Sequence, residues 1–289
     1  MEPTPPNPAA PQPPKLKIYF LPNLLTAGNL FCGFVALTKI VEVEKAQIES
    51  GDFKQIYSAL GFILLACIFD LLDGRVARMG GRESPFGREF DSLADLISFG
   101  AAPAFLVHRI VLKDSFARYP EIGWFISSIY LVCGAFRLAR FNCLSAMPHS
   151  GNGKDFLGFP IPSAAGLVAS LTLLMIWFQE KDFSKGYLRY ILPVLMLFLS
   201  WMMVSEVKYP SFKTLDLRAT RTFTRTLVGI FFIGALVVFW DRLPVLLGFV
   251  LPVFFTSYLV YGFIRPHISR QTRHLIEEED EDDEGSSTV

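Results

Sequence analysis

Long blocks of apolar residues, separated by short polar stretches, dominate the pattern of this 289-residue chain. Within a block such as FFIGALVVFW, at residues 231–240, the apolar residues are continuous rather than spaced at the period of an amphipathic helix or strand. A water-soluble core of this size cannot hide so much continuous apolar surface. The pattern therefore predicts that the solvent around this chain is a lipid bilayer.

Runs of roughly 17–25 mainly apolar residues are typical of transmembrane helices, and about eight such segments can be placed along the chain. They are Leu24–Val41, Ile56–Val76, Leu93–Leu112, Ile122–Leu138, Ser163–Phe178, Tyr190–Val204, Leu227–Trp240 and Leu243–Ile264. The last two are short or closely spaced, so a re-entrant pair is an alternative at that place. The predicted fold class is all-α, a polytopic integral membrane bundle of helices.

The formal net charge of zero is the sum of unlike parts. Residues 277–284 read EEEDEDDE, and without these eight acids 19 acidic residues remain against 27 basic ones, a charge of +8. If the N-terminus is cytoplasmic and the spans alternate, 17 of the 27 basic residues lie on the inner side, as the positive-inside rule favours. We therefore expect a protein of the inner (cytoplasmic) membrane with both termini in the cytoplasm.

Four aspartates lie at helical spacing where the second span ends and the third begins. Asp70 and Asp73 are three residues apart, and Asp91 and Asp95 are four residues apart at the start of the third span, so each pair shares one helix face. Two antiparallel helices joined by a short loop would bring the four carboxylates together. Acids at membrane depth are costly and usually functional, so we expect the active site here.

Four neighbouring carboxylates repel one another unless cations neutralise them. Mg²⁺ and Mn²⁺ are hard cations that prefer oxygen ligands, so a divalent-metal site is the favoured interpretation. The alternative is a set of interfacial ion pairs with the arginines of the same stretch, Arg75, Arg78, Arg82 and Arg88. A single acid would favour ion pairing, whereas four acids at this spacing favour metal.

Small and basic residues accompany the acids. Gly74 and Ala77 leave room for a flat ring or a diphosphate to approach the helix backbone, and Arg78 can pair with phosphate. The stretch from Asp70 to Asp95 reads D-x-x-D-G-x-x-A-R, then eight residues, then G-x-x-x-D-x-x-x-D. At every fixed position, and with the same gap, it resembles the signature of the CDP-alcohol phosphotransferase family.

The resemblance implies a fold, a reaction and a role for each matching residue. The family has a core of six transmembrane helices, and its members transfer a group from a CDP-linked lipid to an alcohol and release CMP. The four aspartates would bind Mg²⁺ or Mn²⁺, with two ions expected, and Asp95, sometimes shared with Asp91, would be the general base. The remaining matching positions, Gly74, Ala77, Arg78 and Gly87, would line the CDP pocket.

The start of the first span supports the same family. Residues 22–29 read PNLLTAGN, which resembles the family's P-N-x-x-T-x-x-N motif. Asn23 and Thr26, with Asn29 as a further candidate, lie at helical spacing and can hydrogen-bond phosphate or cytosine. Taken alone, these residues would favour an N-cap and helix packing, but beside the aspartates they favour nucleotide binding.

Two more stretches bear on the acceptor alcohol. FRLARFN at residues 136–142 and GFPIP at residues 158–162 resemble the branch of the family that uses serine. Arg137 and Arg140 share a helix face and can clamp a carboxylate or a lipid phosphate, and Asn142 can position the amino or hydroxyl group of serine. The equally weighted alternative for the arginines is the positive charge found at any cytoplasmic helix end.

We therefore expect an enzyme of phospholipid biosynthesis that transfers the phosphatidyl group of CDP-diacylglycerol to L-serine. The products are phosphatidylserine and CMP. A sister enzyme using glycerol 3-phosphate, inositol phosphate or choline is the first alternative. A divalent-cation transporter is less favoured, because it would place acids near the midplane of several helices. Membrane lipid and a second copy in a homodimer are expected partners, and nucleic acid is not.

The expected organisation has four parts. Residues 1–15 form a proline-rich, disordered N-terminus, and residues 16–205 form the membrane core. Residues 206–268 hold a cytoplasmic loop and the extra C-terminal helices, and residues 269–289 form an acidic, disordered tail.

Overall fold

The structure is a computed structural model, and it describes residues 19–79, 84–146, 155–180, 190–210 and 243–264. Most of these residues are helical, and the rest form two short strands and connecting turns. The longer helices are α1 (Phe20–Glu42), α3 (Lys54–Met79), α4 (Pro85–Asp95), α7 (Pro120–Ala146), α8 (Ile161–Glu180), α9 (Ile191–Val204) and α11 (Leu243–Ile264). The shorter elements are α2 (Lys45–Ser50), the π-helices η1 (Leu96–Ala101) and η2 (His108–Leu112), α5 (Ala102–Val107), α6 (Lys113–Ser115), β1 (Asp155–Leu157) and β2 (Lys208–Pro210).

Five helical segments in the described part of the chain are long and apolar enough to cross a membrane. They are Phe20–Glu42, Lys54–Ala77, Pro85–Ser115, Pro120–Ser145 and Ile161–Gln179, and the shorter apolar helices are Ile191–Val204 and Gly248–Ile264. The prediction of a polytopic, all-α membrane protein is confirmed. The predicted span Leu227–Trp240, the proline-rich N-terminus and the acidic tail lie outside the described residues.

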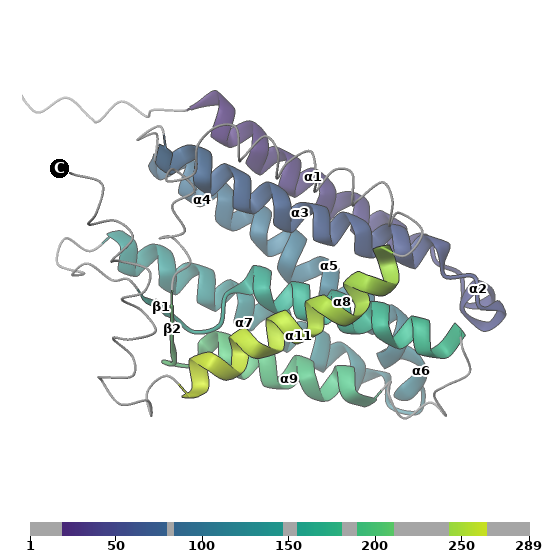
Figure 1. The fold of residues 1–289 in the computed structure, drawn as a ribbon. Helices are drawn as coiled ribbons and strands as arrows, with labels where there is room; N and C mark the ends of the chain where they lie inside the picture. The colour runs from purple at the N-terminus through teal and green to yellow at the C-terminus, as the bar shows by residue number, and fades with distance from the viewer. Residues whose placement is uncertain (1–18, 80–83, 147–154, 181–189, 211–242, 265–289) are drawn as a thin grey trace, which may run out of the picture.

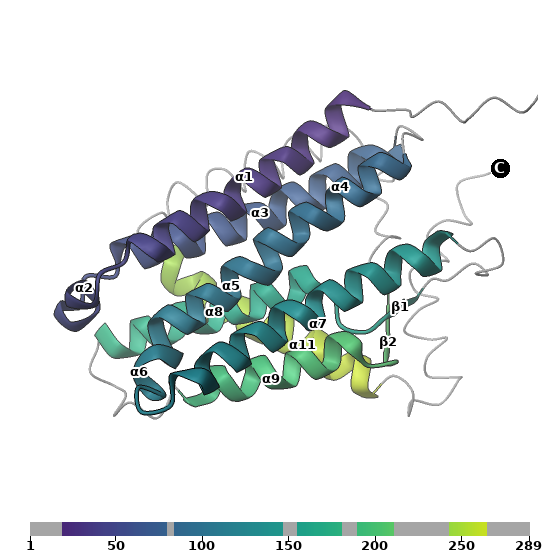
Figure 2. The same cartoon turned by 180° about the vertical axis from the view of Figure 1, so that it is seen from behind.

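The long helices form two layers (Figure 1). One layer contains α1, α3 and α4, and the other contains α7, α8, α9 and α11; α5 leads from the first toward the second, as the reverse view also shows (Figure 2). The pair β1–β2 lies at one end of the bundle, and α2 and α6 lie at the other. The ends of α3 and α7 and the starts of α1 and α4 gather at the β1–β2 end, which is where the predicted site residues are.

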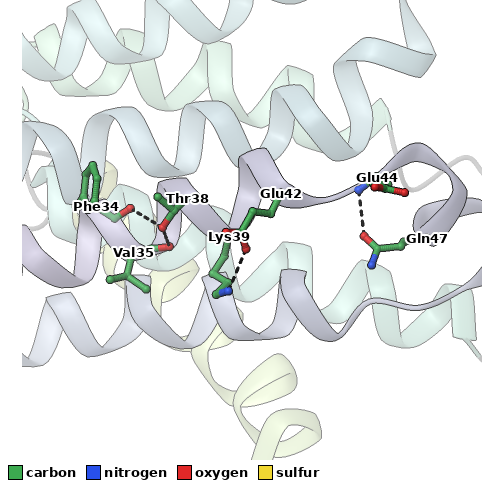
Figure 3. A network of polar contacts seen from close by, with 7 residues as sticks. All are labelled: Phe34, Val35, Thr38, Lys39, Glu42, Glu44 and Gln47. Carbon is green, nitrogen blue, oxygen red and sulfur yellow. Dashed lines mark hydrogen bonds and ion pairs between the residues drawn. The ribbon is translucent and has the colours of Figure 1, made fainter.

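Polar contacts hold the opposite end of α1 and mark the start of α2 (Figure 3). Lys39 and Glu42 form an ion pair of 2.9 Å in the last turn of α1. The Glu44 main-chain N–H donates to Gln47 Oε1 over 3.0 Å, half of a reciprocal capping box that satisfies donors left open at a helix start. The predicted end of the first span, Val41, is correct to within one residue, whereas α1 begins four residues before the predicted start at Leu24.

The third span begins two turns earlier than the sequence predicted. Ser84 caps α4 by accepting a hydrogen bond of 3.0 Å from the Gly87 main-chain N–H, and Pro85 occupies the first turn, where its missing N–H is tolerated. From Pro85 to Ser115 the helical path is continuous and includes two π-helical segments. Asp91 and Asp95 consequently lie well inside a helix, so the expectation that they sit at its start is wrong.

Two three-residue strands join the stretches around residues 155–160 and 205–210. β1 pairs antiparallel with β2, with Asp155 opposite Pro210 and Leu157 opposite Lys208. Gly158 follows β1 at φ 78°, and an added Cβ would overlap the Met203 carbonyl, so only glycine fits this turn. The turn places Phe159 in the core, where it is fully buried.

The fourth span also differs from its prediction. It was expected to end at Leu138, but α7 continues for two further turns to Ala146. The predicted span stopped short because Arg140, Asn142 and Ser145 interrupt the apolar run in this extension. The side chains of Arg140 and Asn142 in this extension form hydrogen bonds within the protein.

Candidate active site

Three of the four predicted aspartates meet between α3 and α4. One carboxylate oxygen from each of Asp70, Asp91 and Asp95 lies within 4.8 Å of the other two; we call these residues the carboxylate cluster. Asp95 is buried, and Asp70 and Asp91 are half-buried. No other group of three or more potential metal ligands was found among the described residues.

The fourth aspartate, Asp73, is held from α1. Thr26 donates a hydrogen bond of 2.8 Å from its hydroxyl to Asp73 Oδ2, and the same hydroxyl lies 3.1 Å from the Pro22 carbonyl oxygen. Both Thr26 and Asp73 are buried, with 3% and 4% of their surface exposed. Thr26, predicted to contact the nucleotide, therefore fixes a carboxylate in this structure, and Asp73 is outside the three-residue cluster.

Asn29 contacts the carboxylate cluster at the place where α1 and η1 approach each other closely. Its Nδ2 donates to Asp95 Oδ1 over 3.0 Å, and its main-chain carbonyl accepts a hydrogen bond of 2.9 Å from the Ser98 hydroxyl. Opposite Ser98 lies Gly33, where an added Cβ would be 2.7 Å from the Ser98 Cα. Glycine at this position lets α1 approach closely enough to orient Asp95.

The start of α4 makes a second contact with α1. A Cβ added to Gly87 would be 3.3 Å from Asn23 Oδ1, so the two positions predicted to contact CDP are neighbours. Asn23 Nδ2 is buried and has no hydrogen-bond partner among the described residues. On α3, Gly74 and Ala77 are half-buried, whereas the side chain of Arg78 is outside the part that the structure describes.

The chemistry of the carboxylate cluster fits a divalent metal ion. Its ligand atoms are all carboxylate oxygens, which magnesium and manganese prefer. Asp91 Oδ1 is buried without a hydrogen-bond partner in the described structure, and an unpaired buried oxygen costs about 1–3 kcal/mol. A cation bound there would remove this cost and the repulsion among the three carboxylates.

Arg137 places a buried cation beside the cluster. Its side chain is 7% exposed, and its charge interacts with those of Asp95 and Asp70. The guanidinium carbon lies 5.6 Å from the centre of the Phe141 ring, and Nε has no hydrogen-bond partner among the described residues. Because a buried guanidinium needs acceptors, this arginine retains capacity to bind an anionic group.

Arg140, predicted to act with Arg137, is engaged elsewhere. Its Nη1 donates to the Val204 carbonyl over 2.8 Å, and its Nη2 lies 3.0–3.3 Å from the carbonyls of Leu157, Met203 and Ser205. Three of these four carbonyls belong to the C-terminal end of α9, where a cation is favourable. Arg140 thus joins α7, β1 and α9.

Asn142 ties α7 to α4. Its Nδ2 donates to the Ser92 hydroxyl over 3.0 Å and approaches Glu89 Oε2 at 3.3 Å. Its Oδ1 is buried without a partner in the described part of the chain. The three residues predicted for the acceptor therefore occupy three different environments.

Comparison with known proteins identifies the class of this chain. Residues 19–205 match the CDP-alcohol phosphatidyltransferase family. The chain belongs to this family, so it is an integral membrane enzyme of the kind that the aspartate motif predicted.

Similar proteins over most of the chain have related names. The CDP-diacylglycerol–serine O-phosphatidyltransferase of Helicobacter pylori is 35% identical over 250 residues, covering 86% of this chain and 91% of that protein. The protein of the same name from Bacillus subtilis is 32% identical over 199 residues, covering 67% and 92%. The archaetidylserine synthase of Methanothermobacter thermautotrophicus is 33% identical over 192 residues, covering 66% and 69%.

Sequence reasoning missed two residues of the site. Ser98 carried no motif, and its contact with Asn29 depends on the approach that Gly33 allows. Gly33 and Ser98 are small residues that face each other across α1 and η1. Their pairing can be recognised only when the helix packing is known.

Proposed function

We propose that this protein is a CDP-diacylglycerol–serine O-phosphatidyltransferase, which converts CDP-diacylglycerol and L-serine to phosphatidylserine and CMP. The observation that carries the proposal is the carboxylate cluster beside the buried Arg137. The cluster suits a diphosphate substrate bound with metal, and the arginine suits an acceptor that carries a carboxylate. The names of the similar proteins support serine as this acceptor.

In the proposed reaction, the serine hydroxyl oxygen attacks the phosphorus that carries the diacylglycerol. A new P–O bond forms to serine as the P–O bond to CMP breaks, and CMP leaves with the electron pair of that bond. The hydroxyl proton passes to Asp95, which acts as the general base. Asn29 donates to Asp95 Oδ1 and so holds the carboxyl group in one orientation.

We assign metal binding to Asp70, Asp91 and Asp95, with Asp73 held nearby by Thr26. The expected ions are Mg²⁺ or Mn²⁺, two per site. When bound, such ions neutralise charge on the phosphate oxygens and stabilise the leaving group. Chelation of divalent cations should abolish CMP release, and readdition of either ion should restore it.

The donor and acceptor bind on different sides of the cluster in this proposal. The nucleotide side is formed by Asn23 and Gly87 together with Gly74, Ala77 and Arg78 of α3. The acceptor side is formed by Arg137, which would bind the serine carboxylate. Arg140 supports this side through the main-chain carbonyls it contacts, and Asn142 supports it by joining α7 to α4.

We further propose that the site opens to the cytoplasmic face of the inner membrane and that the enzyme is a homodimer. The orientation rests on the distribution of basic residues along the chain. The dimer rests on the family resemblance. Cysteine accessibility at either end of the bundle, and the mass of the purified protein in detergent, would test these two statements.

Serine dependence tests the proposed function directly. Purified protein with CDP-diacylglycerol and Mn²⁺ or Mg²⁺ should release CMP only when serine is added, and phosphatidylserine should appear in equal amount. The same assay with glycerol 3-phosphate, inositol phosphate and choline provides the comparison. Release supported by one of these alcohols, and not by serine, would reassign the chain to a sister enzyme.

A further inference from the structure

An apolar groove lies between α1 and η1. Its volume is about 490 Å³, within the range of roughly 300–1,000 Å³ that is typical of ligand sites. All six lining residues are apolar, and they are Ala27, Leu30, Phe31, Phe34, Leu37 and Ile97. The groove therefore has the size and the chemistry for a hydrocarbon ligand.

The groove starts beside the carboxylate cluster. On one wall, Leu30 directly follows Asn29, whose Nδ2 donates to Asp95 Oδ1 over 3.0 Å. On the other wall, Ile97 precedes Ser98, whose hydroxyl donates to the Asn29 carbonyl over 2.9 Å. The hydrogen bonds that hold Asp95 thus also fix both walls of the groove, so the groove has a set position relative to the cluster.

The same face of α1 carries the groove and part of the nucleotide side of the proposed site. Residues at steps of four, three, four and three share this face, and they are Asn23, Ala27, Leu30, Phe34 and Leu37. Asn23 comes first, and its Nδ2 is buried without a hydrogen-bond partner among the described residues. From Ala27 to Leu37 the face runs for about 15 Å, at roughly 1.5 Å per residue. A ligand with a polar head near Asn23 and a long apolar tail would match this face.

We propose that the groove between α1 and η1 binds one acyl chain of the donor lipid. The inference deepens the proposed function and rests on it in one respect, which is that the diphosphate of CDP-diacylglycerol binds at the carboxylate cluster. A head group bound there tethers its diacylglycerol at the mouth of the groove. The tethered chain then has a high effective concentration, which favours it over the other lipids of the bilayer.

The groove would hold the chain by packing rather than by exclusion of water. Surrounding lipid tails are as apolar as the groove, so the transfer of a chain from the bilayer gains little hydrophobic energy. What remains is the sum of close contacts between carbon atoms. The rings of Phe31 and Phe34 are exposed at the rim, so most of their surface is available for such contacts.

Donors of different chain length test this proposal with Leu37→Trp, which fills the end of the groove farthest from the cluster. The KM for CDP-dioleoylglycerol should rise about threefold or more, which corresponds to the loss of roughly four to six carbon contacts. The KM for CDP-dihexanoylglycerol should not change, because its chains are too short to reach Leu37. The KM for serine should also keep its wild-type value.

Phe34→Ala is a second variant, and it removes part of the wall without adding bulk. It should raise the KM for CDP-dioleoylglycerol, and its Tm should stay near that of the wild type because the ring is exposed. Val253→Trp is the control, since Val253 of α11 is exposed and lies outside the groove. The proposal is overturned if both groove variants leave the KM for CDP-dioleoylglycerol unchanged, raise the KM for both donors equally, or match the control.

The same measurements separate this inference from the proposed function and from another occupant. Serine-dependent CMP release without any chain-length effect of the groove variants would refute the groove and keep the proposed function. If another alcohol replaces serine, the ratio of the two donor KM values, measured with the alcohol that works, still decides the role of the groove. A dimer that dissociates in Leu37→Trp while both donor KM values stay unchanged would assign the groove to a second copy of the chain and overturn the proposal.

Discussion

Replacing Gly33 by alanine should separate α1 from η1 and disable the site. The added Cβ would lie 2.7 Å from the Ser98 Cα, whereas carbon atoms need about 3.5 Å. The two backbones must therefore move apart by roughly 0.8 Å. The same movement would lengthen the Ser98–Asn29 and Asn29–Asp95 hydrogen bonds, now 2.9 and 3.0 Å, to roughly 3.7–3.8 Å, beyond the usual range.

The expected result is a loss of both stability and activity. Overpacking of this kind costs about 1–3 kcal/mol, against a gain of up to about 1 kcal/mol from the better helix propensity of alanine. Thermal unfolding in detergent should therefore show a lowered Tm. CMP release should fall further than the Tm predicts, because Asp95 loses the donor that orients it.

Gly61→Ala is the matched control on α3. A Cβ at Gly61 meets no atom within 4 Å, so this variant should keep its activity and gain slightly in Tm. Gly33→Ala with wild-type activity and wild-type Tm would show that α1 and η1 adjust without cost. That result would refute the claim that their close approach positions Asp95.

Four further substitutions test other parts of the site. Asp91→Asn should lower CMP release by at least about 100-fold without lowering the Tm, because it removes one of several like charges; full activity would exclude Asp91 from the chemistry. Thr26→Val removes the donor to Asp73 at constant shape and should lower kcat/KM about tenfold or more, measured with CDP-diacylglycerol as the varied substrate. Arg140→Lys should lower the Tm with little change in the KM for serine, because an ammonium group cannot reach four carbonyls at once. Arg137→Lys should show the opposite pattern, and equal effects of the two variants would contradict the separate roles given to these arginines.

The positions of most helices could be predicted from the sequence because the bilayer imposes a simple rule. A spanning helix must be long and predominantly apolar, so the predicted run at Leu243–Ile264 coincides with α11. The errors occurred where helices carry polar residues beyond the apolar run. α4 begins before the apolar run chosen for its span and α7 ends after it, because charged residues such as Arg88 and Arg140 interrupt the apolar pattern there.

The site was predictable only to the level of which residues take part. Helical spacing and the family signature selected Asp70, Asp91 and Asp95, and the structure brings them together. Spacing along one helix could not show that Asp73 faces Thr26 on α1. Nor could it show that Arg137 lies near the acids whereas Arg140 binds main-chain carbonyls, because side chains three residues apart can share a face without sharing partners.

The sequence by itself determined that a bilayer surrounds the chain, where most helices lie and which acids take part. The reason is that continuous apolar runs and charges at membrane depth are compatible with few structures. Only the tertiary structure decided how these parts act on one another. The approach of α1 at Gly33, the carbonyl contacts of Arg140 and the docking of α11 on α8 and β2 all join residues distant in sequence. Such contacts depend on the shapes of whole helix surfaces, and no local pattern in the chain records them.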